Sequence, residues 1–175
     1  KWSYWGGNIV KGDDGRYRMF VCGWLENSPK GHGEWANSLV FDAVSDNLAG
    51  PYTVRQLVAK GHNPEVYRLA DGRYVMYVID GRYVSDSLDG PWVYGTFDFD
   101  ACGRNIIAGL SNLTFARRED GSFLMVCRGG GVWMSRDGLS TYHQVTDKSV
   151  YPAVEGRFED PVIWRDHIQY HLIVN

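Results

Sequence analysis

Short runs in which hydrophobic and polar residues alternate with a period of two recur along the chain. Three of these runs follow an Asp-Gly pair, and in each an aromatic residue and a methionine stand two positions apart. The three runs are residues 14–19, 71–76 and 120–125, and a weaker fourth copy holds Tyr170 and Leu172. Alternation of this kind is typical of β-strands, and Asp-Gly between two such runs predicts a hairpin. The aromatic residue and the methionine (Tyr17 and Met19 in the first run) should therefore lie on one buried face. No segment shows the 3.6-residue period of an amphipathic helix, so the pattern predicts an all-β protein.

A second repeat follows the first. Its copies are residues 45–52 and 85–92, which read Ser-Asp-x-x-x-Gly-Pro followed by Tyr or Trp, and a divergent copy at residues 135–142. In each copy a strand should end at the serine, a polar turn should follow, and the aromatic residue should open the next strand. Together the two repeats define a unit of four short strands that recurs roughly every 50 residues, which is typical of a β-propeller blade.

The repeats predict a single partial propeller domain over residues 1–175, with about three and a half blades. The expected blades span about 5–60, 61–100, 105–150 and 158–175, and the fourth is incomplete. A half blade leaves a strand edge unpaired, which proteins avoid. We therefore expect the remaining blades to come from chain outside this sequence or from a second copy of it. Residues 23–37 form the longest expected loop over one face.

The composition of the chain argues against several classes of binding partner. The chain is 44% hydrophobic and 22% charged, with a net charge of −3 and no basic cluster longer than Arg117-Arg118, so nucleic acid is a poor candidate partner. No apolar run approaches the ~20 residues of a membrane span, and the visible chain shows no signal peptide. Cys22, Cys102 and Cys127 have neither the even number nor the C-x-x-C spacing that would predict disulfides or zinc, so we expect buried free thiols and no metal site.

Candidate chemistry concentrates in the stretch Glu159-Asp160-Pro161, just before an apolar run. Proline is tolerated at the first residue of a strand, so the strand is predicted to start at Pro161. Successive side chains in extended chain point to opposite faces, so the two acids can share one site only if the backbone bends between them. The alternative is a solvated acidic turn without a function.

The Ser-Asp-x-x-x-Gly-Pro-Tyr/Trp repeat, together with Asp-Pro or Glu-x-Pro before a strand, resembles the five-bladed propeller glycoside hydrolases. These include the family 43 arabinanases and xylosidases, the invertases and the agaro-oligosaccharide hydrolases. The resemblance implies a five-bladed propeller that cleaves oligosaccharides derived from plant or algal polysaccharides. It also implies carboxylates at the strand entrances: an Asp base, an Asp that tunes and a Glu general acid. The resemblance further implies an inverting mechanism, no cofactor, and a secreted or periplasmic location. A calcium ion on the propeller axis is compatible with the resemblance, but no motif in the sequence predicts one.

Matched residue by residue, Asp160 fits the Asp-Pro pattern and Glu159 fits the Glu-x-Pro pattern, so the two catalytic candidates remain Glu159 and Asp160. The other three expected entrances, Asn8, Asn63 and Asn112, carry amides, which cannot act as general bases. The missing acid therefore lies outside the visible sequence, or catalysis is lost. If the inner strands of the blades converge on one axis, these three residues and Asp160 should reach one cavity. The candidate substrate-binding residues are His62, Asn63, Asn8, Asn112, His32 and Trp35, with Glu34 beside the last two.

Two rival functions remain open. A carbohydrate-binding propeller without hydrolytic activity fits the amides at the entrances. A protein-interaction propeller is weaker, since no Trp-Asp or kelch-like repeat is present.

Overall fold

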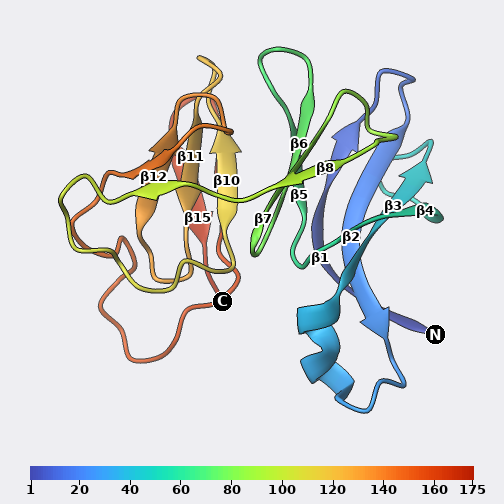
Figure 1. Ribbon diagram of the computed structural model, residues 1–175, viewed down its shortest axis with the longest axis horizontal. Helices are drawn as coiled ribbons and strands as arrows, with labels where there is room; N and C mark the ends of the chain where they lie inside the picture. The colour runs from blue at the N-terminus through green and yellow to red at the C-terminus, as the bar shows by residue number, and fades with distance from the viewer. The chain divides into compact units, whose positions relative to one another are not determined.

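The computed structural model describes residues 1–175 and is built almost entirely from β-strands, with one short 3-10 helix, η1 (Gly31–Asn37) (Figure 1). The strands form four separate sheets. The chain divides into two compact units, a first unit (Lys1–Gly95) and a second unit (Thr96–Asn175), which are described in turn. None of the helical structure has the length and apolar character that a membrane crossing requires.

The first unit holds two four-stranded antiparallel sheets in which sequence neighbours pair. The strands of the first sheet are β1 (Trp2–Lys11), β2 (Tyr17–Leu25), β3 (Leu39–Ser45) and β4 (Thr53–Lys60). The strands of the second sheet are β5 (Glu65–Arg68), β6 (Tyr74–Val78), β7 (Gly81–Ser85) and β8 (Val93–Gly95). Helix η1 lies in the connection from β2 to β3.

The core of the first unit corrects one prediction. Tyr74 and Met76 are buried as expected, but in β2 it is Arg18 and Phe20 that are buried, while Tyr17 and Met19 are only half-buried. Phe20 packs in one cluster with the residues of the second sheet. The reason is that Arg18, on the same face as Phe20, has carboxylate partners that the local pattern does not show.

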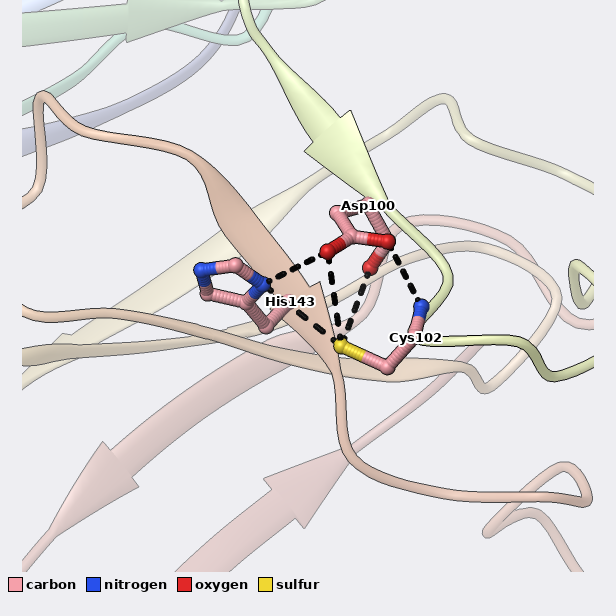
Figure 2. Close-up of side chains that lie close together, drawn as sticks. All are labelled: Asp100, Cys102 and His143. Carbon is pink, nitrogen blue, oxygen red and sulfur yellow. Dashed lines mark hydrogen bonds and ion pairs between the residues drawn. The ribbon is translucent and has the colours of Figure 1, made fainter.

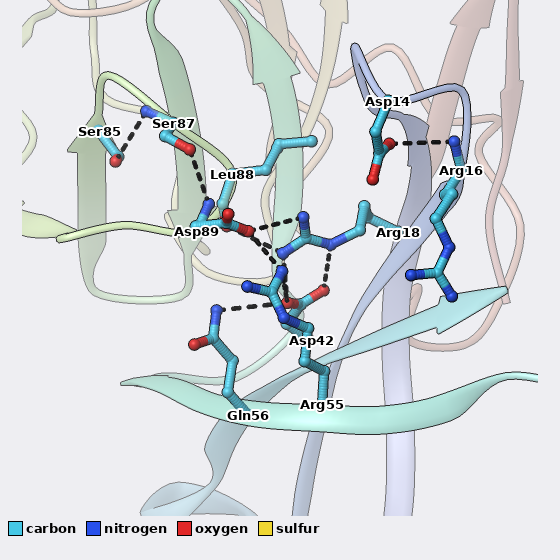
Figure 3. A network of polar contacts seen from close by, with 10 residues as sticks. All are labelled: Asp14, Arg16, Arg18, Asp42, Arg55, Gln56, Ser85, Ser87, Leu88 and Asp89. Carbon is cyan, nitrogen blue, oxygen red and sulfur yellow. Dashed lines mark hydrogen bonds and ion pairs between the residues drawn. The ribbon is translucent and has the colours of Figure 1, made fainter.

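Those partners form a polar network around Arg18 (Figure 3). Arg18 Nε donates to Asp42 Oδ1 of β3 over 2.8 Å, and Nη1 donates to Asp89 Oδ1 over 2.8 Å. Asp42 is fully buried, and Arg55 also pairs with Asp89. Asp89 belongs to the second copy of the Ser-Asp-x-x-x-Gly-Pro repeat, so this turn ties the second sheet to the first. Hydrogen bonds from Arg55 and Arg18 hold the pKa of Asp89 below its ordinary value.

The second unit holds a five-stranded and a two-stranded sheet. The order of the larger sheet is β10 (Thr114–Arg117), β11 (Phe123–Val126), β12 (Val132–Ser135), β13 (Tyr142–Gln144) and β9 (Phe99–Asp100). The smaller sheet pairs β14 (Val162–Arg165) with β15 (Tyr170–Ile173). Strand β9 runs parallel to β13, so residues 99–100 join the third sheet and not the second, where the expected ranges had placed them.

Two contacts between successive sheets occur in both units. The side chain of Asn8, within β1, exchanges two hydrogen bonds with the backbone of Val66, and Thr114 Oγ1, at the start of β10, accepts the N–H of Ile163 over 3.1 Å. Because these polar groups are satisfied across the gap, each first strand is fixed against the next.

At the far end of the strands an arginine repeats the connection. Arg68 of β5 pairs with Asp13 over 2.9 Å and lies over the ring of Tyr74, and Arg165 of β14 pairs with Glu119 over 2.8 Å and lies over the ring of Tyr170. The two arginines each stand five residues after an entrance residue, Asn63 and Asp160. The sheets are therefore repeats in their contacts as well as in their strand order.

Candidate functional site

The residues just before the first strands share an unusual backbone conformation. Asn63, Asn112 and Asp160 have φ values of 49°, 45° and 46°, in the left-handed region that non-glycine residues rarely occupy. Asn and Asp tolerate this region better than other residues because their short polar side chains bond locally. The backbone conformation alone therefore favours Asn or Asp at these entrance positions, whatever chemical role the side chains have.

The first entrance corrects the prediction for Asn8. Gly6, with φ of 50°, occupies the position that Asn63 occupies in the second sheet. Asn8 lies two residues further along the same strand, β1, and its side-chain amide bonds the backbone of Val66. The prediction was two residues too late because glycine adopts the left-handed conformation without an amide side chain. A search for Asn or Asp at the entrance therefore selects Asn8 instead of Gly6.

In the second unit the structure brings two of the predicted residues together. Asn112 Nδ2 donates to Asp160 Oδ1 over 3.0 Å, although 48 residues separate them. The strand following Asp160 starts at Val162, one residue later than predicted, and Pro161 is buried. Asn112 thus orients the carboxylate at the neighbouring entrance.

The left-handed conformation of Asp160 bends the backbone next to Glu159. A bend at this point is what the two adjacent acids would need in order to face the same site. Glu159 precedes this bend, and its backbone exchanges hydrogen bonds of 2.9 and 3.0 Å with Asn175. Its exposed carboxylate lies 3.7 Å from Arg128 Nη1. This pairing places Arg128 beside a candidate catalytic acid.

Glu159 lines an open pocket of 630 Å³ in the second unit. The aromatic wall of the pocket is formed by Tyr151 and Phe158, whose rings are 4.8 Å apart, and Tyr151 donates its hydroxyl hydrogen to the Cys127 carbonyl. Burial raises the pKa of Tyr151 to about 12. The cationic side of the pocket holds Arg128, Lys148 and Arg157. Sequence reasoning did not single out this wall, because residues 145–158 form a loop with no repeat to mark them.

In the first unit three predicted residues gather around aromatic rings. His62 is nearly buried, and its ring centroid lies 5.1 Å from that of Trp35 and 6.1 Å from that of Trp24. His32 meets the edges of Trp24 and Trp5. Helix η1 thus places His32 and Trp35 next to the His62-Asn63 entrance.

The polar contacts of His62 define its orientation. Its Nδ1 lies 3.0 Å from Ser38 Oγ and 3.4 Å from Cys22 Sγ. His62 also lines a pocket of 290 Å³ with Lys60, Asp80 and Tyr83. Glu34, by contrast, is engaged with Ser28 and Asn37 on its own loop, and these hydrogen bonds lower its pKa.

Comparison with known proteins gives a consistent answer at the level of fold. No protein-family model and no curated protein matches the sequence. Solved structures do match. A GH43_1 enzyme from Xanthomonas citri, complexed with xylotriose, is 13% identical and has a TM-score of 0.63 over 97% of this chain and 62% of its own.

Two further matches come from related enzymes. Zg3597, a family 117 glycoside hydrolase from Zobellia galactanivorans, is 14% identical, with a TM-score of 0.64 over 90% of this chain and 48% of its own. An endo-1,5-α-L-arabinanase from Thermotoga petrophila is 19% identical, with a TM-score of 0.55 over 79% of this chain and 38% of its own.

The predicted fold is therefore confirmed: the chain is part of a five-bladed β-propeller of the kind found in family 43 and family 117 glycoside hydrolases. It spans less than two thirds of the length of each of these structures.

Proposed function

We propose that this chain is part of a glycoside hydrolase that cleaves oligosaccharides derived from plant or algal polysaccharides, with Asp160 and Glu159 among its acids. The observation that supports this most directly is the carboxylate of Asp160 at a strand entrance, oriented by Asn112 and followed by Pro161. The family 43 and 117 structures that share the fold support the class of reaction, since one of them contains xylotriose and another is named as an arabinanase.

The chemistry requires two carboxylates on opposite sides of the glycosidic bond. In an inverting enzyme they stand ~6.5–9.5 Å apart, which leaves room for the attacking water. The other entrances of this chain carry Gly6, Asn63 and Asn112, which offer no acid. We assign the inverting mechanism, with the partner carboxylate supplied by another part of the complete protein. The carboxylate mechanism needs no cofactor, and the secreted or periplasmic location expected for such an enzyme belongs to the same proposal.

A second candidate function is a propeller that binds carbohydrate without cleaving it. The observation that favours it is that the other entrances carry Gly6, Asn63 and Asn112 and offer no second carboxylate, while Glu159 lies 3.7 Å from Arg128 Nη1. In that case the pocket lined by Tyr151, Phe158 and Arg128 would bind the sugar without cleaving it.

The test is hydrolysis by the complete protein of activated aryl glycosides and of natural oligosaccharides, over arabinosides, xylosides and galactosides. If Glu159 is the general acid, Glu159→Gln should cleave aryl glycosides nearly normally, because their leaving group needs no protonation, and should lose 10²–10⁴-fold on the natural substrate. Glu119→Gln, which removes an exposed acid elsewhere in the second unit, is the matched control. Binding of oligosaccharide without hydrolysis of any substrate would replace the catalytic proposal with the binding one.

A further inference from the structure

A cluster of three potential metal ligands lies on the surface of the second unit, in residues that the proposed function does not use (Figure 2). Asp100 ends β9, and His143 lies in the middle of β13. The parallel pairing of these strands puts His143 directly opposite Asp100, and Cys102 follows two residues later. Cys102 is exposed, which corrects the expectation that all three thiols are buried.

The three donor atoms converge on one point. Cys102 Sγ lies 3.5 Å from His143 Nδ1 and 3.7 Å from Asp100 Oδ2, and Nδ1 lies 3.2 Å from Oδ2. For a tetrahedral zinc ion with ordinary bond lengths, the corresponding distances are about 3.6, 3.5 and 3.3 Å. The three atoms therefore already form one face of a tetrahedron of the size that zinc requires.

The same geometry argues against a catalytic triad. In a Cys-His-Asp triad the thiol meets one ring nitrogen of the histidine, and the carboxylate orients the ring through the other nitrogen. Here Cys102 Sγ and Asp100 Oδ2 both face Nδ1, and the other ring nitrogen points away from the cluster (Figure 2). This arrangement has no relay of protons, but it suits a single ion bound by all three groups.

The local backbone holds the ligands in place without an ion. The N–H of Cys102 donates to Asp100 Oδ1 over 2.8 Å, which leaves Oδ2 facing the other two donors. Cys102 has φ of 53°, a left-handed conformation that a β-carbon disfavours, and it turns the thiol back toward the strand pair.

We propose that Asp100, Cys102 and His143 bind Zn²⁺ through one oxygen, one sulfur and one nitrogen, with the fourth position open to water or another ligand. Zinc is the ion that best suits this mixed donor set. The ion would join the two-residue strand β9 to β13, where backbone pairing is minimal, and would secure the segment that leads into the second unit.

The experiment is titration of the reduced, chelator-treated full chain with Zn²⁺, and with Co²⁺ as a spectroscopic substitute. We expect one ion per chain with micromolar or tighter affinity, a thiolate-to-cobalt charge-transfer band, and a higher melting temperature with zinc. Cys102→Ser should abolish the charge-transfer band, and His143→Ala should weaken binding at least tenfold. All three side chains are exposed, so these variants should fold.

The matched control is His171→Ala. His171 pairs with Asp166 over 2.8 Å in the same unit, but that pair has no thiol near it. Metal binding by this variant should be unchanged. Binding only at millimolar zinc, cobalt binding without the charge-transfer band, or unchanged binding in Cys102→Ser would each overturn the proposal.

Discussion

The entrances of the second and the fourth sheet have the same backbone but different chemistry. Asn63 and Asp160 share φ values of 49° and 46°, and a buried proline follows each of them. At the second entrance Asn63 follows His62, which is nearly buried and packs beside Trp35. At the fourth entrance the Asp160 carboxylate accepts a hydrogen bond from Asn112, and the preceding Glu159 is exposed. The same backbone conformation accepts either Asn or Asp. The presence of a carboxylate at the fourth entrance is therefore explained by the chemistry of that side chain and not by the backbone.

The largest effect should come from making the fourth entrance resemble the second. Asp160→Asn keeps the left-handed backbone and retains an oxygen to accept the hydrogen bond from Asn112, so the stability should change little. If Asp160 is the base or the tuning acid, hydrolysis should fall 10²–10⁴-fold, a barrier increase of roughly 3–5 kcal/mol, on activated and natural substrates alike. Steady-state kinetics and thermal melting measure the two quantities. Unchanged kinetics would remove Asp160 from the catalytic assignment.

The ion pairs of the two units differ in burial, and stability measurements should separate a buried pair from an exposed one. Asp42→Ala should lower the free energy of unfolding by about 3–5 kcal/mol, because it leaves the buried Arg18 guanidinium without its main partner. Glu119→Ala removes the partner of Arg165 at the surface and should cost about 0–1 kcal/mol. Urea denaturation of both variants provides the comparison. Equal losses would mean that the network around Arg18 does not stabilise the first unit as described.

Alanine at the two entrances should cost about the same in both units. Asn63→Ala and Asp160→Ala place a β-carbon with no local hydrogen bond in the left-handed region, at a cost of roughly 1–2 kcal/mol each. Asn63→Gly and Asp160→Gly relieve that strain and should be less destabilising than alanine. The measurement is again urea denaturation. An entrance at which glycine is worse than alanine would show that its side-chain contacts outweigh the backbone.

The smallest effect concerns acid stability, to which the second unit contributes two aspartates. Hydrogen bonds from His171 and from the N–H groups of Gln169 and Ile168 lower the pKa of Asp166 to about 2. For Asp137, burial raises the pKa, but the N–H groups of Ser140 and Leu139 outweigh it and bring the value to about 2. Because the folded pKa values are depressed, the stabilisation is fully present above the ordinary value near 3.8 and is lost as the pH falls toward 2.

The check is thermal melting between pH 5 and pH 2. Asp137→Asn and Asp166→Asn should each flatten the decline in melting temperature over this range. A decline as steep as that of the unchanged protein would show that these carboxylates are not held in their charged form by the fold.

Local signals allowed much of the fold to be predicted. The Asp-Gly turns and the Ser-Asp-x-x-x-Gly-Pro turns act within a few residues, and Ser85 Oγ, for example, accepts the N–H of Ser87 two positions on. The buried face of β2 was predicted wrongly because the partners of Arg18 lie 24 and 71 residues away. A pattern of period two shows which residues share a face, but not which face has a partner sheet.

The candidate site was predictable only in part, for a similar reason. Asn112 and Asp160 were named from the repeat, and the structure brings them together. That all four predicted entrance residues reach one cavity stays a prediction. The group of Asp100, Cys102 and His143 arises from a parallel pairing of β9 with β13, which joins residues 43 positions apart and leaves no spacing motif in the sequence.

Because the entrances share one backbone conformation that accepts both Asn and Asp, such a protein can evolve in a particular way. Asparagine and aspartate differ by a single amide group, and codons for the two are one base apart. A strand entrance that accepts either residue can gain or lose a carboxylate in one mutational step, without a new turn or a repacked strand. Catalytic acids could therefore move from one blade to another, or disappear to leave a binding protein, while the fold stays as it is.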